Sequence, residues 1–251
     1  MALVHEMENQ GNFLFRYRSY LPLLLFPPAF WVMAYNQKLH PDWFSTSQVT
    51  TLEICAIAIC FVGLLIRVLT IGYTPANTSG RNTAQGQVAD TINKTGIYSL
   101  VRHPLYVGNF FMWLGIAILP GELWFVLTFV LIYWLYYDSI MFAEEQFLIR
   151  KFGDAYTQWS KSTPAFVPKL SSWKSPTISF SWKKVLKKEK NGLFAIFLIV
   201  LIFDIWLNYL TTSTWTSNKP ILIYLAIGTA ILYFILKFVK SGTKWLDEEG
   251  R

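Results

Sequence analysis

The fold is decided by the stretch Y-V-G-N-F-F-M-W-L-G-I-A-I-L-P-G-E-L-W-F-V-L-T-F-V-L-I-Y-W-L-Y-Y-D-S-I-M, from Tyr106 to Met141. Two apolar runs in it are separated only by the turn Pro120-Gly121-Glu122. Two helices joined by so short a turn run antiparallel. We therefore predict a helical hairpin whose open ends, near His103 and Glu144, emerge on the same side of a membrane and at the same depth.

The composition is that of an integral membrane protein. Of the 251 residues, 53% are hydrophobic and only 15% are charged, whereas a soluble domain carries about 25% charged residues. The mean hydropathy is +0.36. The net charge of +7 does not indicate a nucleic-acid partner, because the basic residues lie between apolar segments, as juxtamembrane charges do.

Six apolar segments are candidate membrane helices, and they cover residues 20–35, 49–73, 106–119, 123–141, 193–210 and 221–238. A helix needs about 20 residues to cross the hydrocarbon, so the first and third segments are short. Of the 22 basic residues, all but Lys38 and Lys219 lie on or near the side that holds both termini. The excess of basic residues predicts that this side is cytoplasmic. The expected fold class is all-α, a polytopic membrane protein with about six transmembrane helices.

The chain divides into three expected parts. Residues 1–73 hold the N-terminal membrane helices, residues 74–170 a core with the hairpin, and residues 171–251 a basic linker and two further helices. No metal site is expected, because the histidines His5, His40 and His103 are scattered and no cysteine spacing fits one.

Polar motifs flank the hairpin on its cytoplasmic side. G-I-Y-S-L-V-R-H-P-L-Y-V-G-N, residues 96–109, precedes it, and A-E-E-Q-F-L-I-R-K-F-G-D-A-Y, residues 143–156, follows it. The hairpin brings an Arg-His pair to a Glu-Glu pair, which suits a small ligand of mixed charge. S-adenosylmethionine is such a ligand. Arg102 or His103 could bind its carboxylate, and Glu144 or Glu145 could accept from its ammonium. Tyr106 offers an aromatic face to its cation, and Gly108 permits close approach to the backbone.

The paired motif R-H-P-L-Y-V-G and E-E-x-x-L-x-x-x-F-G-x-x-Y resembles the isoprenylcysteine carboxyl methyltransferase and phospholipid methyltransferase superfamily, in its bacterial type. The resemblance covers about residues 96–168. It implies an S-adenosylmethionine site that faces the cytoplasm, with His103 and Glu145 as catalytic candidates. The cofactor-binding residues that it implies are Arg102, His103, Tyr106, Gly108, Glu144 and Glu145.

Four further residues are candidates for binding the substrate. Arg81 and Asn82 follow a flexible glycine and suit an anionic headgroup, and Tyr98 and Asn109 flank the Arg-His motif. Tyr98 could equally belong to the aromatic belt at the membrane interface. Where the family often has an Arg-Val-Pro-like segment that contributes to the acceptor site, this chain has S-K-S-T-P, residues 160–164.

Two aspartates lie within predicted membrane helices, where ionisable groups are costly and commonly functional. Asp138 lies before the Glu-Glu pair and is the better functional candidate, whereas Asp204 is expected to pair with a neighbouring helix.

The resemblance implies methyl transfer from S-adenosylmethionine to a lipid or lipid-linked acceptor. An amine acceptor would have to lose a proton, for which Glu144, Glu145 or His103 could serve as base. No dedicated base stands out beyond the cofactor set, which favours an anionic oxygen, a phosphate or a carboxylate. The expected location is a bacterial inner membrane. The oligomeric state and the glutamate that contacts the cofactor stay open.

Two alternatives come from other classes of protein. NADPH-dependent sterol-type membrane reductases share an R-H-x-x-Y-x-G signature, but they typically have Asn before the Tyr, Asp after the Gly and Arg-Asp in place of Glu-Glu. This chain has Leu105, Asn109 and an intact Glu-Glu pair at those places. The other alternative is a non-catalytic membrane carrier or assembly protein.

Overall fold

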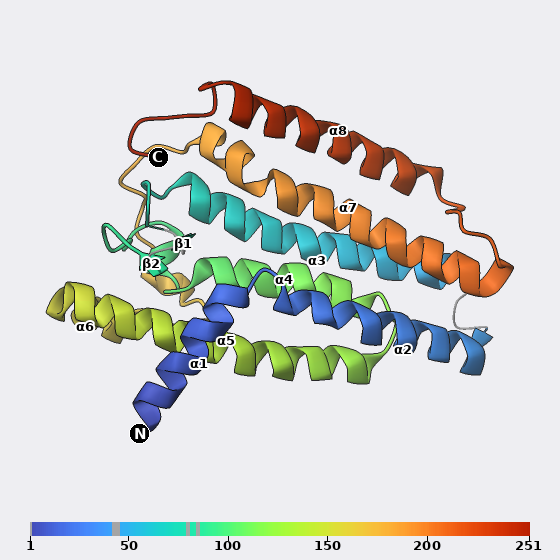
Figure 1. Cartoon of the computed structure of the whole chain (residues 1–251), viewed down its shortest axis with the longest axis horizontal. Coiled ribbons are helices and arrows are strands. Elements are labelled where there is room, and N and C mark those ends of the chain that lie inside the picture. The colour runs from blue at the N-terminus through green and yellow to red at the C-terminus, as the bar shows by residue number, and fades with distance from the viewer. Residues whose placement is uncertain (1, 42–45, 79–80, 84–85) are drawn as a thin grey trace.

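A computed structural model describes residues 2–41, 46–78, 81–83 and 86–251 of the chain. Most of the described chain is helical, and the long helices lie side by side (Figure 1). The α-helices are α1 (Leu3–Tyr17), α2 (Phe26–Leu39), α3 (Thr46–Gly72), α4 (Pro104–Ile118), α5 (Leu123–Phe152), α6 (Asp154–Ser162), α7 (Trp182–Thr212) and α8 (Pro220–Gly242). Short 3-10 helices are η1 (Leu21–Leu25), η3 (Ile97–Ser99) and η4 (Leu170–Ser172), and β1 (Arg81–Thr83) pairs antiparallel with β2 (Gly86–Val88).

The predicted hairpin is confirmed as α4 and α5, two antiparallel neighbours joined by a short turn (Figure 1). α4 starts at Pro104, because proline is well suited to the first turn, where its missing N–H would have no helical partner. The turn contains Gly121 with a φ of 77°, a conformation that glycine adopts without steric cost. α5 ends at Phe152, and the next residue, Gly153, also has a positive φ, of 54°.

Among the described residues, four helices are long and apolar enough to cross a membrane: α3, α5, α7 and α8. α4 is a shorter apolar helix, and α2 has 14 residues, so the expected number of six spans is not confirmed. α7 begins well before the apolar run at 193, because the basic stretch 183–190 continues the same helix after an N-cap at Ser181. Both termini lie at the same end of the helical bundle (Figure 1).

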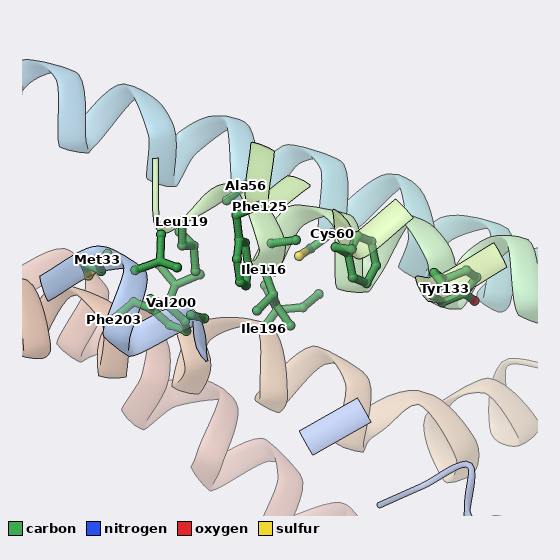
Figure 2. Packing of buried hydrophobic residues seen from close by; sticks show 14 of the residues in the cluster. Met33, Ala56, Cys60, Ile116, Leu119, Phe125, Tyr133, Ile196, Val200 and Phe203 are labelled. Atoms are coloured by element: carbon green, nitrogen blue, oxygen red, sulfur yellow. The ribbon is translucent and has the colours of Figure 1, made fainter. Parts of the chain in front are cut away.

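The α3–α4 pair is closely packed because glycines remove side chains at the crossing. A Cβ on Gly63 would lie 2.7 Å from the backbone nitrogen of Met112, and a Cβ on Gly108 would lie 2.5 Å from Cγ of Arg67. Around this crossing lies an apolar core that joins several helices (Figure 2). Labelled members of the core include Met33, Ala56, Cys60, Ile116, Leu119, Phe125, Tyr133, Ile196, Val200 and Phe203.

The end of the bundle remote from the termini holds a buried charge cluster. Lys219 Nζ lies 2.5 Å from a carboxylate oxygen of Glu53 and 3.0 Å from one of Asp204. These residues come from α3, α7 and the residue before α8. The predicted pairing of Asp204 with a neighbouring helix is therefore confirmed.

Candidate active site

A polar cavity of about 340 Å³ lies beside the open end of the α4–α5 hairpin. This volume is at the lower end of the range for small-molecule sites. The predicted site residues Tyr98, Arg102, His103, Tyr106, Asn109 and Glu144 all line it. The hairpin therefore brings residues from both halves of the paired motif into one wall.

His103 lies between the two glutamates of α5. Its Nε2 is 2.9 Å from Oε1 of Glu145, and its Nδ1 is 3.4 Å from Oε2 of Glu144. Arg102 Nη2 lies 3.2 Å from the same oxygen of Glu145. Glu145 binds both basic residues but is not itself among the residues that line the cavity.

The surroundings of His103 stabilise its charged form. Burial by itself lowers the pKa of this imidazole, but hydrogen bonds and charge interactions with Glu144 and Glu145 outweigh it and raise the pKa to about 9. His103 is therefore protonated at neutral pH, with a carboxylate facing each ring nitrogen. A protonated imidazole can hold a carboxylate in place, but it cannot accept a proton.

An aromatic group continues the wall along α4. The Tyr106 hydroxyl donates to Glu144 at 2.8 Å, and its ring stacks on His103 with 5.6 Å between centroids. On its other side Tyr106 packs against Tyr137, with 4.9 Å between centroids. Tyr133 donates to the carbonyl of Tyr106 at 2.7 Å. These contacts fix the first turn of α4.

A second charged group lines the cavity and was not predicted from the sequence. Arg67 of α3 binds Glu189 of α7 through Nε and Nη2, each 2.7 Å from a carboxylate oxygen. Its Nη1 donates to Oδ1 of Asn109 at 2.5 Å. In the sequence Arg67 lies within the apolar segment 49–73 and Glu189 within the basic linker, so neither was a candidate site residue. No sequence spacing links α3 to α7.

The N-terminal helix α1 is a further wall that the sequence did not reveal. α1 lies across α5, and its Phe15 and Arg18 line the cavity. The guanidinium of Arg18 lies 3.8 Å above the Phe15 ring, a cation–π contact. A Cβ on Gly11 would overlap the backbone of Ser139, so this glycine permits the close approach of α1 to α5.

Several buried polar atoms beside the cavity make no hydrogen bond within the described part of the chain. They are Nε of Arg102, the hydroxyl of Tyr156 and Nε1 of Trp159. All three residues line the cavity. A buried donor without a partner costs about 1–3 kcal/mol. Such atoms therefore favour a ligand that supplies acceptors.

Other predicted site residues lie elsewhere. Gly108 faces Arg67 and α3 rather than the cavity, so its role in the fold is close helix packing. Arg81 and Asn82 form β1, but their side chains lie outside the described part of the structure. Asp138 is exposed and does not line the cavity, so it is not placed where the sequence hypothesis required.

The segment S-K-S-T-P, residues 160–164, lies beside the Arg-His motif in space. The backbone N–H of Arg102 donates to the carbonyl of Pro164 at 2.9 Å, and that of His103 donates to Ala165 at 3.2 Å. Lys161 is the only cation in the segment, and its side chain is exposed. The segment therefore supports the backbone of the motif and adds no charge to the cavity.

An apolar cavity of about 470 Å³ adjoins the polar one. It lies among η1, α2 and the apolar half of α5, and its walls include Leu24, Trp31, Trp124 and Phe129. Tyr137 lines both cavities. The polar site thus shares a wall residue with a space that suits a hydrocarbon chain.

Comparison with known proteins shows which family the chain resembles. A family model described as phospholipid methyltransferase matches residues 51–155. This range includes the Arg-His motif, the hairpin and the second half of the paired motif up to the residue before Tyr156. Over these residues the chain is similar to the isoprenylcysteine carboxyl methyltransferase and phospholipid methyltransferase superfamily.

Several curated members of this superfamily or relatives of it are similar to the chain. Protein-S-isoprenylcysteine O-methyltransferase of Schizosaccharomyces pombe is 43% identical over 74 residues, 29% of this chain and 31% of that protein. The cobalt-zinc-cadmium resistance protein CzcN of Cupriavidus metallidurans is 30% identical over 138 residues, 54% of this chain and 57% of that protein. The human protein-S-isoprenylcysteine O-methyltransferase is 26% identical over 128 residues, 50% of this chain and 44% of that protein.

The chain thus matches between about a third and three fifths of the length of these relatives. No solved structure matches it. Phe15, Arg18 and Glu189 lie outside the part that the superfamily model matches, yet all three line the polar cavity. Among the described residues, no group of three or more His, Cys, Asp and Glu side chains is arranged to hold a metal ion.

Proposed function

We propose that the protein is an S-adenosylmethionine-dependent membrane methyltransferase whose acceptor is an anionic oxygen of a lipid or lipid-linked molecule. One observation carries the proposal: Arg102 and His103 meet Glu144 and Glu145 at the wall of a cavity that adjoins an apolar one. The superfamily's paired motif supplies all four residues.

The residues at the cavity fit this cofactor. The unpartnered donors of Arg102, Tyr156 and Trp159 suit its carboxylate and the acceptor atoms of its adenine and ribose. Glu144, about a fifth exposed, offers a carboxylate to its ammonium. When bound, the cofactor supplies an activated methyl group.

The charges of the wall favour an anionic acceptor. Among the described side chains, five cations line the cavity, namely Arg18, Arg67, Arg102, His103 and Lys188. Glu144 and Glu189 line it as well, and Glu145 binds the lining residues Arg102 and His103. The carboxylates are outnumbered, and the cofactor adds a further cation. An anionic acceptor balances this excess, whereas an amine would increase it.

The protonated state of His103 agrees with this choice. Methylation of an amine requires a base that removes a proton, and both ring nitrogens of His103 already face carboxylates. A phosphate or carboxylate is ionised near neutral pH and needs no base. The chain's residues then bind, orient and exclude water.

The apolar cavity supports a lipid-linked acceptor. Its walls are almost entirely hydrocarbon and aromatic, and Tyr137 lines both this cavity and the polar one. A substrate could keep its hydrophobic tail there while its charged group reaches the cofactor. A bacterial inner membrane with both termini in the cytoplasm agrees with the distribution of basic residues.

The test uses membranes that contain the protein, incubated with S-adenosylmethionine labelled on its methyl group. We expect label in the lipid fraction, released as methanol by mild base if the acceptor is a carboxylate and retained as a methyl phosphate ester, identified by mass spectrometry, if it is a phosphate. We expect the loss of this label in His103→Ala. The matched control is His5→Ala, since His5 is exposed on α1, and this variant should retain transfer. Label found on nitrogen by mass spectrometry would indicate an amine acceptor. Absence of both label and cofactor binding would refute the proposal and favour the reductase or the non-catalytic carrier.

A further inference from the structure

We propose that Arg67 is the binding site for the anionic group of the acceptor, and that Glu189 of α7 and Asn109 of α4 position it. This inference rests on the proposed function and makes it more specific. It assigns a role to a residue outside the paired motif and to a helix outside the part that the superfamily model matches.

The first support is the number of donors that Arg67 retains. A guanidinium has five N–H donors. Nε and Nη2 each use one on Glu189, and Nη1 uses one on Asn109. One N–H on each terminal nitrogen is not used by these bonds. The Arg67 side chain is 22% exposed, whereas Glu189 is 4% exposed, and Arg67 lines the polar cavity. The arginine, rather than its partner, is therefore the accessible member of the pair.

The second support is the direction in which the guanidinium is held. Glu189 binds it with two parallel hydrogen bonds, the geometry that fixes an arginine most precisely. Asn109 is itself fixed, because its Nδ2 donates to the hydroxyl of Tyr137 at 3.3 Å. Tyr137 lines both the polar and the apolar cavity. Arg67 is thus linked through Asn109 to the residue that lines both cavities, one of which suits the tail of a lipid-linked acceptor.

The third support is the excess of positive charge that remains in the cavity wall. Arg102 and protonated His103 are paired with Glu144 and Glu145. The other lining cations, Arg18, Arg67 and Lys188, are accompanied by a single further carboxylate, Glu189. The paired residues of the motif suit a cofactor that carries both signs of charge, and the remaining positive excess suits an anion.

The fourth support is the absence of another cation where the superfamily resemblance leads us to look. The S-K-S-T-P segment has no arginine, and its Lys161 is exposed and does not line the cavity. A cation for the acceptor then has to come from another element, and Arg67 of α3 is a lining cation held by two partners.

The experiment uses the full chain in nanodiscs of phosphatidylcholine. Two anionic probes are used, N-acetyl-S-farnesylcysteine and dodecyl phosphate, each beside its neutral counterpart, the carboxamide and dodecanol. Affinity is measured by displacement in the presence of S-adenosylhomocysteine, so that it does not depend on turnover. Affinity for S-adenosylhomocysteine alone is measured separately.

The main variant is the double substitution Arg67→Gln with Glu189→Gln. It removes both charges together, because removing the arginine alone would leave a buried carboxylate without a partner and risk unfolding. Glu189→Gln alone retains the cation but loses its fixed orientation. The matched control is Arg150→Gln, since the Arg150 side chain is 57% exposed and its ion pair with Glu8 is at the surface. A thermal melt of each variant reports folding.

We expect the wild type to bind at least one anionic probe about tenfold or more tightly than its neutral counterpart, as charge-assisted hydrogen bonds provide. The double variant should lose this preference and keep its affinity for S-adenosylhomocysteine within about twofold. Glu189→Gln should raise KM for the anionic acceptor more than it lowers kcat. Which probe is preferred identifies the carboxylate or the phosphate.

Two results would overturn the inference: a wild type that does not distinguish the anionic from the neutral probes, or a folded double variant that still does. A wild type that binds the anionic probe but not S-adenosylhomocysteine would instead refute the proposed function and leave the anion site standing. A variant that loses only its cofactor affinity would assign Arg67 to the cofactor and overturn the inference as well.

Discussion

The charge on His103 should make the stability of the protein depend on pH in a defined way. The pKa of His103 is raised from an unfolded value near 6.5 to about 9 by Glu144 and Glu145. A raised pKa means that the folded state binds the proton more tightly than the unfolded state. The stabilisation is therefore complete below pH 6.5 and is lost as the pH rises through 9.

The size of this effect follows from the shift. One pKa unit corresponds to about 1.4 kcal/mol, so a shift of this size contributes about 3 kcal/mol to the free energy of unfolding. This is a large share of the stability of a typical domain. The perturbation is His103→Gln, because glutamine retains hydrogen bonds to the carboxylates but carries no charge at any pH.

The assay measures the free energy of unfolding of the reconstituted protein at intervals between pH 6 and 10, by denaturant titration with tryptophan fluorescence. The difference between wild type and His103→Gln cancels other titrating groups. We expect this difference to fall by about 3 kcal/mol across the range. His5→Gln, at an exposed position of α1, should show the wild-type profile. Parallel pH profiles of the wild type and His103→Gln would refute the reasoning.

Three further predictions concern packing, ligand binding and the remote charge cluster. Gly63→Ala should lower the free energy of unfolding by about 1–3 kcal/mol or more in denaturant titration, because its Cβ would overlap the α4 backbone; an unchanged midpoint would contradict the tight crossing. Tyr156→Phe should leave stability unchanged, since its hydroxyl has no partner in the described chain, yet weaken S-adenosylhomocysteine binding by calorimetry about tenfold; equal affinity would exclude this contact. Lys219→Met should cost about 3–5 kcal/mol, because two buried carboxylates lose their cation, and a thermal shift of less than a few degrees would argue against it.

The local parts of the fold could be predicted from the sequence. The turn at Pro120-Gly121-Glu122 predicted the hairpin, and the hairpin brought His103 and Glu145 within 2.9 Å although 42 positions separate them. These inferences succeeded because a short turn leaves two helices a single antiparallel arrangement. Asp204 was interpreted correctly as well, because an aspartate in an apolar segment requires a partner.

The contact between Arg67 and Glu189 could not be predicted because it depends on packing between helices far apart in the chain. Arg67 and Glu189 are 122 positions apart, and only the order of the helices in the bundle brings them together. Gly108 was assigned to the ligand because a glycine can admit one, but a glycine can equally admit a neighbouring helix, and here it does. α1 was not predicted either, because polar and apolar residues are interspersed along it and no apolar run is long enough to indicate a membrane helix.

The length of α4 has a consequence for how the protein meets the lipid. Its 15 residues extend about 22 Å, whereas the hydrocarbon of a bilayer is about 30 Å thick. No residue of α4 is exposed, so neighbouring helices, and not lipid, surround this short helix. The bilayer therefore has no need to thin beside α4, and a change in membrane thickness acts on the site only through the longer helices that face lipid.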